Sequence, residues 1–159
     1  MLRSMKYPAF VRMLPVLAVA GLASCASRPE AGITRVKIYR LDPNATPDAA
    51  EPAIAFEQKY HLHGAVSETE REARRGNYYT VFFRTPDRAT PVQAKFEYRQ
   101  AATGFRVFAK EITVQPRAGE VRFNITGEDY QLRGRLLGWR VTLTQGGKLL
   151  GQQRSFLWE

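Results

Sequence analysis

The only histidines of this 159-residue chain, His61 and His63, stand two positions apart. On a strand, residues at this spacing point to the same face, so both imidazoles could bind one metal ion. A zinc site needs a third ligand, and the carboxylate of Glu57, Glu68 or Glu70 could supply it. The pattern keeps open a small metal-dependent enzyme centred on His61 and His63. Two histidines beside a loop are more often solvated or hydrogen-bonded, so we expect no metal and no other cofactor.

Other patterns that carry catalytic chemistry are absent from the sequence. It has a single cysteine and no Gly-x-Ser-x-Gly nucleophile elbow, and Ser67 and Ser155 fall in turn-like and strand-like contexts. It also lacks a phosphate-binding loop and a dinucleotide fingerprint. Its carboxylates fall mostly on outward strand positions or in loops. This pattern does not single out two carboxyl groups that could act together as the catalytic pair of a glycosidase. The sequence therefore favours a protein that is not an enzyme.

The single cysteine, Cys25, ends a segment with the order of a secretory signal peptide. Residues 1–24 carry basic but no acidic side chains, and residues 14–22 form an apolar stretch. Pro15 and Gly21 interrupt this stretch, which is shorter than the roughly 20 residues of a membrane-spanning helix. We therefore expect residues 1–24 to be a signal peptide rather than a transmembrane segment.

The residues at the end of this segment, Leu22-Ala23-Ser24-Cys25, resemble the lipobox of bacterial lipoproteins. The resemblance implies that diacylglycerol is attached to the thiol of Cys25 and that a type II signal peptidase cuts between Ser24 and Cys25. Two or three acyl chains on one residue hold a protein on a membrane, whereas one chain binds only marginally. Because Ala26 rather than Asp follows the cysteine, the resemblance favours the outer membrane, facing the periplasm. The alternative is an ordinary signal peptide cut nearby.

The remaining chain has the length of one domain. We expect a lipidated cysteine and tether over residues 25–32 and one domain over residues 33–159. Three of the 24 basic residues precede Cys25, so the mature part has 21 basic and 15 acidic side chains and a formal charge of +6. These basic residues are scattered, whereas a nucleic-acid binder would cluster them. We therefore expect no nucleic-acid partner, and an envelope protein or polysaccharide partner stays open.

Apolar and polar residues alternate along most of this domain, which is typical of half-buried strands. The pattern predicts strands around residues 35–38, 53–60, 78–84, 92–99, 105–114 and 121–125, followed by a hairpin over 137–156. Seven or eight such strands predict an all-β fold, an antiparallel β-sandwich. The segment 127–130, with Tyr130, loosely resembles the tyrosine corner of immunoglobulin-like and fibronectin-like domains, which favours an immunoglobulin-like sandwich.

Two local patterns give sharper predictions. Gly146-Gly147 is a two-residue hairpin loop, and it would place Trp139 opposite Arg154 in a cation–π contact. Ser67 and Glu70 form a capping-box pattern, which predicts one short helix over residues 68–75.

The aromatic pairs at 78–79 and 82–83 must each place one ring on either face of a strand. We expect residues 41–77 to cover the outer rings, and an exposed binding patch is the alternative. Together these patterns favour a lipid-anchored, non-enzymatic binding or accessory module of the cell envelope. A purely structural envelope lipoprotein and the metal-dependent enzyme remain alternatives.

Overall fold

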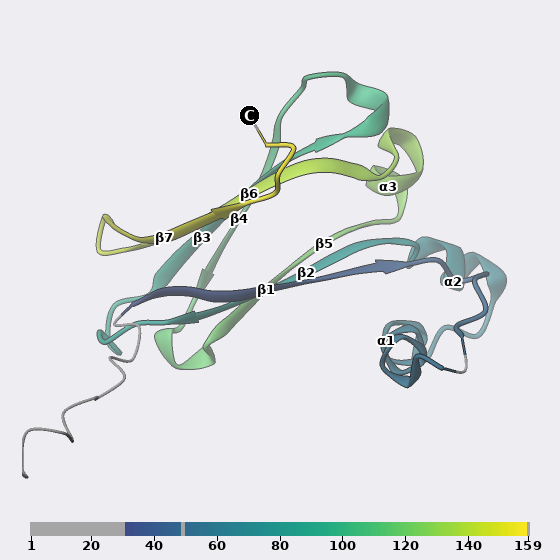
Figure 1. Ribbon diagram of the computed structural model, residues 1–159, viewed down its shortest axis with the longest axis horizontal. Helices are drawn as coiled ribbons and strands as arrows, with labels where there is room; N and C mark the ends of the chain where they lie inside the picture. The colour runs from purple at the N-terminus through teal and green to yellow at the C-terminus, as the bar shows by residue number, and fades with distance from the viewer. Residues whose placement is uncertain (1–30, 49, 159) are drawn as a thin grey trace, which may run out of the picture.

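A computed structural model describes residues 31–48 and 50–158, and in it two antiparallel sheets pack face to face (Figure 1). One sheet has the strand order β1-β2-β5 and the other β4-β3-β6-β7. The strands are β1 Gly32–Leu41, β2 Gly76–Arg84, β3 Val92–Gln100, β4 Phe108–Val114, β5 Glu120–Thr126, β6 Leu136–Gln145 and β7 Lys148–Arg154. The order is that of an immunoglobulin-like sandwich in which the fourth strand pairs with the third. The predicted all-β sandwich is confirmed, with seven strands.

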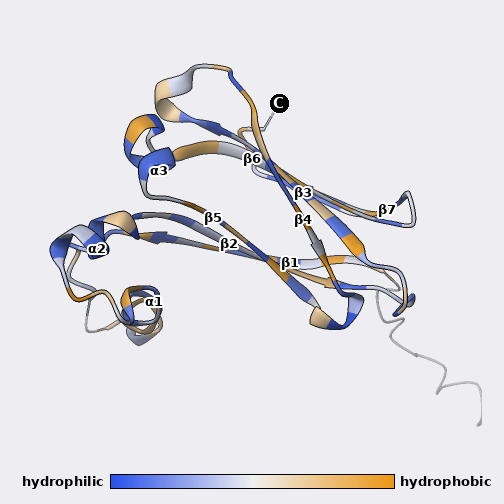
Figure 2. Ribbon diagram, turned by 180° about the vertical axis from the view of Figure 1, so that it is seen from behind, coloured by the Kyte–Doolittle hydropathy of each residue, from blue (hydrophilic) through white to orange (hydrophobic). Residues whose placement is uncertain are grey.

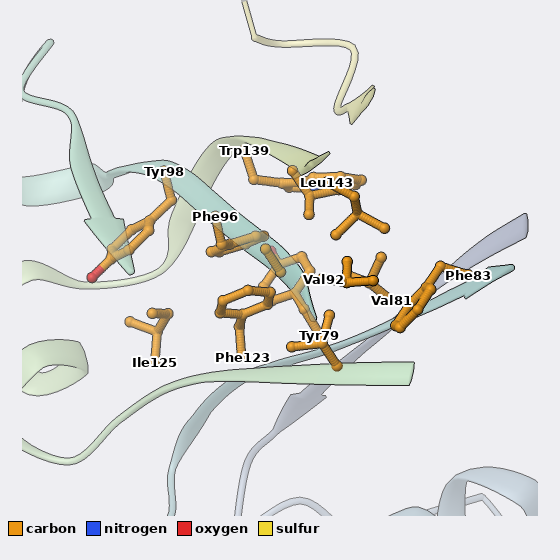
Figure 3. Close-up of a cluster of buried hydrophobic side chains, with 13 residues drawn as sticks. Tyr79, Val81, Phe83, Val92, Phe96, Tyr98, Phe123, Ile125, Trp139 and Leu143 are labelled. Carbon is orange, nitrogen blue, oxygen red and sulfur yellow. The ribbon is translucent and has the colours of Figure 1, made fainter. Parts of the chain in front are cut away.

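Aromatic and aliphatic side chains fill the space between the two sheets (Figure 3). Phe96 lies at the centre, with ring centroids 4.7 Å from Tyr79, 5.0 Å from Phe123 and 6.2 Å from Trp139. These residues occupy the inward positions of β2, β3, β5 and β6, as the alternation predicted. Offset and tilted ring pairs of this kind add stabilisation beyond the area that they bury.

Three short α-helices lie in the connections: α1 Pro52–Leu62, α2 Glu68–Ala73 and α3 Glu128–Arg133. Two single-turn 3₁₀ helices, Ala101–Thr103 and Pro116–Ala118, complete the secondary structure of the described chain. The predicted short helix at 68–75 is confirmed as α2, and its N-cap Ser67 makes the full capping box with Glu70. Tyr130 lies in the β5–β6 connection, as in a tyrosine corner, but on helix α3.

The predicted strand at 53–60 is wrong, because these residues form α1. Pro52 opens the helix, where its fixed φ and missing N–H suit the first turn. No residue of α1 is fully buried, and Ile54 and Phe56 remain exposed. Figure 2 shows apolar and polar residues interleaved along this helix. The period-two pattern therefore did not mark a buried face here.

The last hairpin has the predicted two-residue loop but a different register. Gly146 and Gly147 have φ of +55° and +77°, which suits a type I′ turn. A bulge beyond Thr144 shifts the pairing by one residue, so that Arg154 faces Arg140. The predicted pairing of Trp139 with Arg154 is therefore wrong.

The bulge lies beside the edge of the sandwich at which β1 closes against β7. A β-carbon at Gly151 would lie only 3.1 Å from the backbone nitrogen of Ile33, so any larger residue would require β1 and β7 to move slightly apart. Cation–π contacts in this region involve Trp158 instead, whose ring centre lies 5.3 Å from the guanidinium carbon of Arg140.

Two glutamines occupy inward positions at strand ends and bind neighbouring segments. Gln100, at the end of β3, is fully buried, and its Nε2 donates to the carbonyls of Asp129 (3.0 Å) and Gly134 (2.9 Å) around α3. Gln145, at the end of β6, holds the β2–β3 loop. Its Nε2 donates to the carbonyls of Asp87 (3.0 Å) and Thr90 (2.6 Å), and its Oε1 accepts from the hydroxyl of Thr85. Each amide thus ties one end of the sandwich together.

Candidate functional site: a cleft beneath helix α1

The structure separates the residues that the sequence singled out. Ser24 and Cys25, the predicted cleavage and lipid-attachment site, lie outside the described residues. His61 lies on α1 and His63 is its exposed C-cap residue, so the expectation that both face one side of a strand is wrong. Across residues 31–48 and 50–158, no group of three or more His, Cys, Asp or Glu side chains is placed to hold a metal ion.

His61 instead lines a cleft of about 230 Å³ between α1 and the outer face of the three-stranded sheet. This face belongs to the outward side chains of β1, β2 and β5, which in a two-layer sandwich normally meet water. The helix contributes Phe56, Glu57, Tyr60 and His61, and the sheet contributes Lys37, Tyr78, Thr80, Arg122 and Asn124. Side chains from four separate segments, β1, α1, β2 and β5, thus meet at one place.

The imidazole of His61 is packed among tyrosine rings. Its ring centre lies 5.2 Å from that of Tyr39 in a stacked pair, 3.9 Å from Tyr78 and 5.1 Å from Tyr60. The outer ring of Tyr78 is therefore covered by α1, as expected for the 41–77 segment. The outer ring of Phe82 is covered instead by Arg35 of β1, whose guanidinium carbon lies 4.3 Å from the ring centre.

This environment sets the protonation state of His61. Burial lowers the pKa of His61, because the charged imidazolium loses water. The nearby Glu57 carboxylate opposes this shift, with 3.6 Å between its Oε2 and Nε2 of His61, while Lys37 and Arg122 add to it. The net effect lowers the pKa, so His61 is neutral at pH 7.

The charged groups of the cleft are already paired with one another. The ammonium of Lys37 contacts the carboxylate of Glu57. Arg122 donates from Nη1 to the hydroxyl of Tyr60 at 3.0 Å, and its Nη2 lies 2.7 Å from Oε1 of Glu120. Glu120 does not itself line the cleft, but with it the formal charges of the two cations and their two carboxylate partners cancel. The cleft is thus rich in polar groups but close to neutral.

Polar contacts hold α1 in place. Gln58 donates to the carbonyl of Ala45 at 2.7 Å, and Arg74 donates from Nη1 to the carbonyls of His61 (2.9 Å) and His63 (2.6 Å) at the helix end. The Arg74 carbonyl in turn accepts a hydrogen bond from the hydroxyl of Tyr78 at 2.6 Å. Because carbonyls at a helix C-terminus lack partners within the helix, the guanidinium satisfies groups that would otherwise need water. The α2 segment thus positions α1 over the sheet.

Sequence reasoning named His61 and Glu57 but missed the cations and rings around them. Lys37 and Arg122 occupy outward positions on β1 and β5, which the alternation predicted only as solvent-facing. They meet because β2 pairs with both strands, Lys37 and Arg122 each facing Thr80 in the two ladders. Two strand pairings in succession bring together these residues, which lie 85 positions apart in the chain, and local sequence patterns do not contain this information.

Within the part of the chain that the structure describes, no helix combines the length and the apolar character needed to cross a membrane. Comparisons of the chain with protein-family models, with curated proteins and with solved structures find no match. The cleft and the N-terminal motif are therefore the features from which a function can be argued.

Proposed function

We propose that this chain is a lipid-anchored, non-enzymatic binding module of a bacterial cell envelope, which takes its ligand in the cleft beneath α1. The cleft carries the proposal. It combines exposed aromatic rings with a few convergent polar side chains, as ligand sites commonly do. A helix that buried its own apolar face would be ordinary packing, but α1 leaves Phe56 65% and Tyr60 53% exposed at the rim.

The anchor part of the proposal is supported by the sequence. The apolar stretch at 14–22 and the motif that ends at Cys25 resemble a lipoprotein signal, and Ala26 favours the outer membrane. Lipid on Cys25 would hold the domain at the membrane surface. This arrangement suits a module that acts by keeping a partner near the envelope.

The chemistry of the cleft supports binding rather than catalysis. A general base must reach its substrate with a free nitrogen or carboxylate oxygen. Here tyrosine rings pack around the imidazole of His61, and the carboxylate of Glu57 forms an ion pair with Lys37. The groups that could move protons are used to attach the helix, whereas the rings at the rim and the side chains of Thr80 and Asn124 remain available.

Two arms test the proposal in a Gram-negative host that produces the full chain. In the first, cells are fed a labelled fatty acid and fractionated. The wild type is expected to be labelled and membrane-bound, and Cys25→Ser unlabelled and released from the membrane. A Cys25→Ser variant that stays bound without label would contradict the anchor.

In the second arm, a photoreactive phenylalanine analogue replaces Phe56, or Phe105 as a control. Phe105 is 91% exposed in the β3–β4 connection and does not line the cleft. A binding role predicts that light produces a specific adduct from position 56 and not from position 105. Absence of an adduct at position 56 would contradict the binding role, whatever the ligand.

A further inference from the structure

We infer that the cleft beneath α1 binds a neutral hexopyranose unit of an envelope glycan. The inference rests on the binding role proposed above and names the class of ligand. Its basis is the size of the cleft, the exposed ring pair at its rim, the unpaired hydrogen-bonding side chains of its floor and the balance of its charges.

The size of the cleft limits the ligand to about one ring. Pockets for drug-sized molecules enclose roughly 300–1,000 Å³. The cleft beneath α1 has about 230 Å³, which is below that range. A single sugar ring fits this space, while an extended peptide segment or a folded partner does not enter it.

The rim carries two exposed aromatic side chains one helical turn apart. The ring centroids of Phe56 and Tyr60 lie 6.5 Å apart with an angle of 18° between their planes. Contact between the apolar surface of these rings and water is unfavourable in free energy. A ligand with an apolar face that covers the rings removes this cost. A pyranose has such a face, because axial C–H groups at alternate ring carbons point to the same side of the ring while most hydroxyls project around the edge.

The floor offers partners for those hydroxyls. Thr80 and Asn124 line the cleft, and their side chains make no hydrogen bond to any other residue in the described part of the chain. A hydroxyl and a primary amide each donate and accept, as a sugar hydroxyl does. The guanidinium of Arg122 lies in the same cleft and adds donors in a planar fork.

The charges argue for a neutral ligand rather than an anion. Lys37 contacts Glu57, and Arg122 pairs with Glu120, so each cation already has a carboxylate partner. An anionic ligand would have to separate these pairs or lie beside both carboxylates, where like charges repel. A neutral sugar bonds to the outer edges of the same groups and leaves the pairs intact.

Ligand-observed saturation-transfer NMR and calorimetry test this inference on the full chain, kept in lauryldimethylamine oxide because that detergent contains no sugar. The probes are cellotriose and tri-N-acetylchitotriose, with trigalacturonate as the anionic comparison. We expect a neutral trisaccharide to bind with strongest saturation at its ring C–H protons, and trigalacturonate to bind at least fivefold more weakly. Phe56→Ala should weaken binding at least tenfold and Asn124→Ala several-fold. Phe105→Ala, which removes an exposed ring elsewhere, should leave it unchanged.

Three results would overturn the inference: no binding of either neutral trisaccharide, tighter binding of trigalacturonate, or an equal loss in Phe56→Ala and Phe105→Ala. Unchanged amide spectra of the variants would show that they fold. A photoadduct at position 56 together with no sugar binding would refute the sugar class and leave the binding role standing. No adduct at that position would refute the binding role itself.

Discussion

Replacing each of the two buried glutamines by leucine should have unequal effects, although both changes remove an amide from the same kind of position. Gln145→Leu removes three hydrogen bonds, to Thr85, Asp87 and Thr90. Gln100→Leu removes two, to Asp129 and Gly134. The two sites differ in a second respect. The buried Oε1 of Gln100 finds no donor in the described part of the chain, whereas that of Gln145 accepts from Thr85.

The expected magnitudes follow from this difference. A protein hydrogen bond contributes about 1 kcal/mol net, and an unpaired buried polar atom costs about 1–3 kcal/mol. Gln145→Leu should therefore lower the free energy of unfolding by about 3 kcal/mol. Gln100→Leu loses about 2 kcal/mol of bonds and regains at least about 1 kcal/mol by removing the unpaired oxygen. Its net effect should be about 1 kcal/mol or less.

Urea unfolding of the wild type and both variants, followed by far-ultraviolet circular dichroism and tryptophan fluorescence, measures these values. If the free energy of unfolding depends equally steeply on urea concentration in all three proteins, their unfolding transitions are comparable. The reasoning is refuted when the two variants lose the same stability within about 0.5 kcal/mol, or when Gln100→Leu is the more damaging. Either result would mean that the Oε1 of Gln100 is satisfied in solution.

Three further changes test other parts of the structure. Because burial lowers the pKa of His61, its neutral form stabilises the fold above pH ~6.5, and this contribution is lost as the pH falls through the lowered pKa. Stability should thus fall more steeply between pH 7 and pH 5 in the wild type than in His61→Gln; parallel pH profiles would contradict this. Ser67→Ala should cost about 1 kcal/mol in urea unfolding, because it removes the N-cap of α2, and an unchanged midpoint would argue against the capping box. Phe96→Ala should cost about 3–5 kcal/mol in the same assay, and a loss below ~1 kcal/mol would place Phe96 outside the core.

The central strands of the sandwich could be predicted because each buries one face and therefore alternates, whereas β7 buries no residue fully and was predicted from the Gly146-Gly147 turn before it. The same parity extends to Gln100 and Gln145, which continue the inward positions of β3 and β6. A polar residue at an inward position of a strand end thus indicates a buried amide. The alternation of apolar and polar residues gave a wrong prediction at α1. This helix buries no residue fully, so its sequence shows no apolar stripe of helical spacing.

The register of the last hairpin and the composition of the cleft could not be predicted, for a shared reason. The bulge in β7 lies next to the point where β1 approaches Gly151, and these two segments are more than 110 residues apart in the chain. The cleft depends on β2 pairing with both β1 and β5. Contacts of this kind are decided by packing between distant segments, which local spacing does not encode. The sequence offers His61 and His63 as weak candidate metal ligands, whereas the contacts of His61 are those of a ring packed among tyrosines.

The direction of β1 has a mechanical consequence. Its first residue, Gly32, follows the proposed tether, and its far end leads toward α1, so the attachment point and the cleft lie toward opposite ends of the strand (Figure 1). At about 3.3 Å per residue, the ten residues span roughly 33 Å. A pull between tether and ligand would run along β1, perpendicular to the hydrogen bonds of its ladder with β2. Such a load shears the ladder, so many bonds must break together rather than one after another. A domain loaded in this way would resist separation of β1 from β2, and therefore mechanical unfolding, while a ligand is bound.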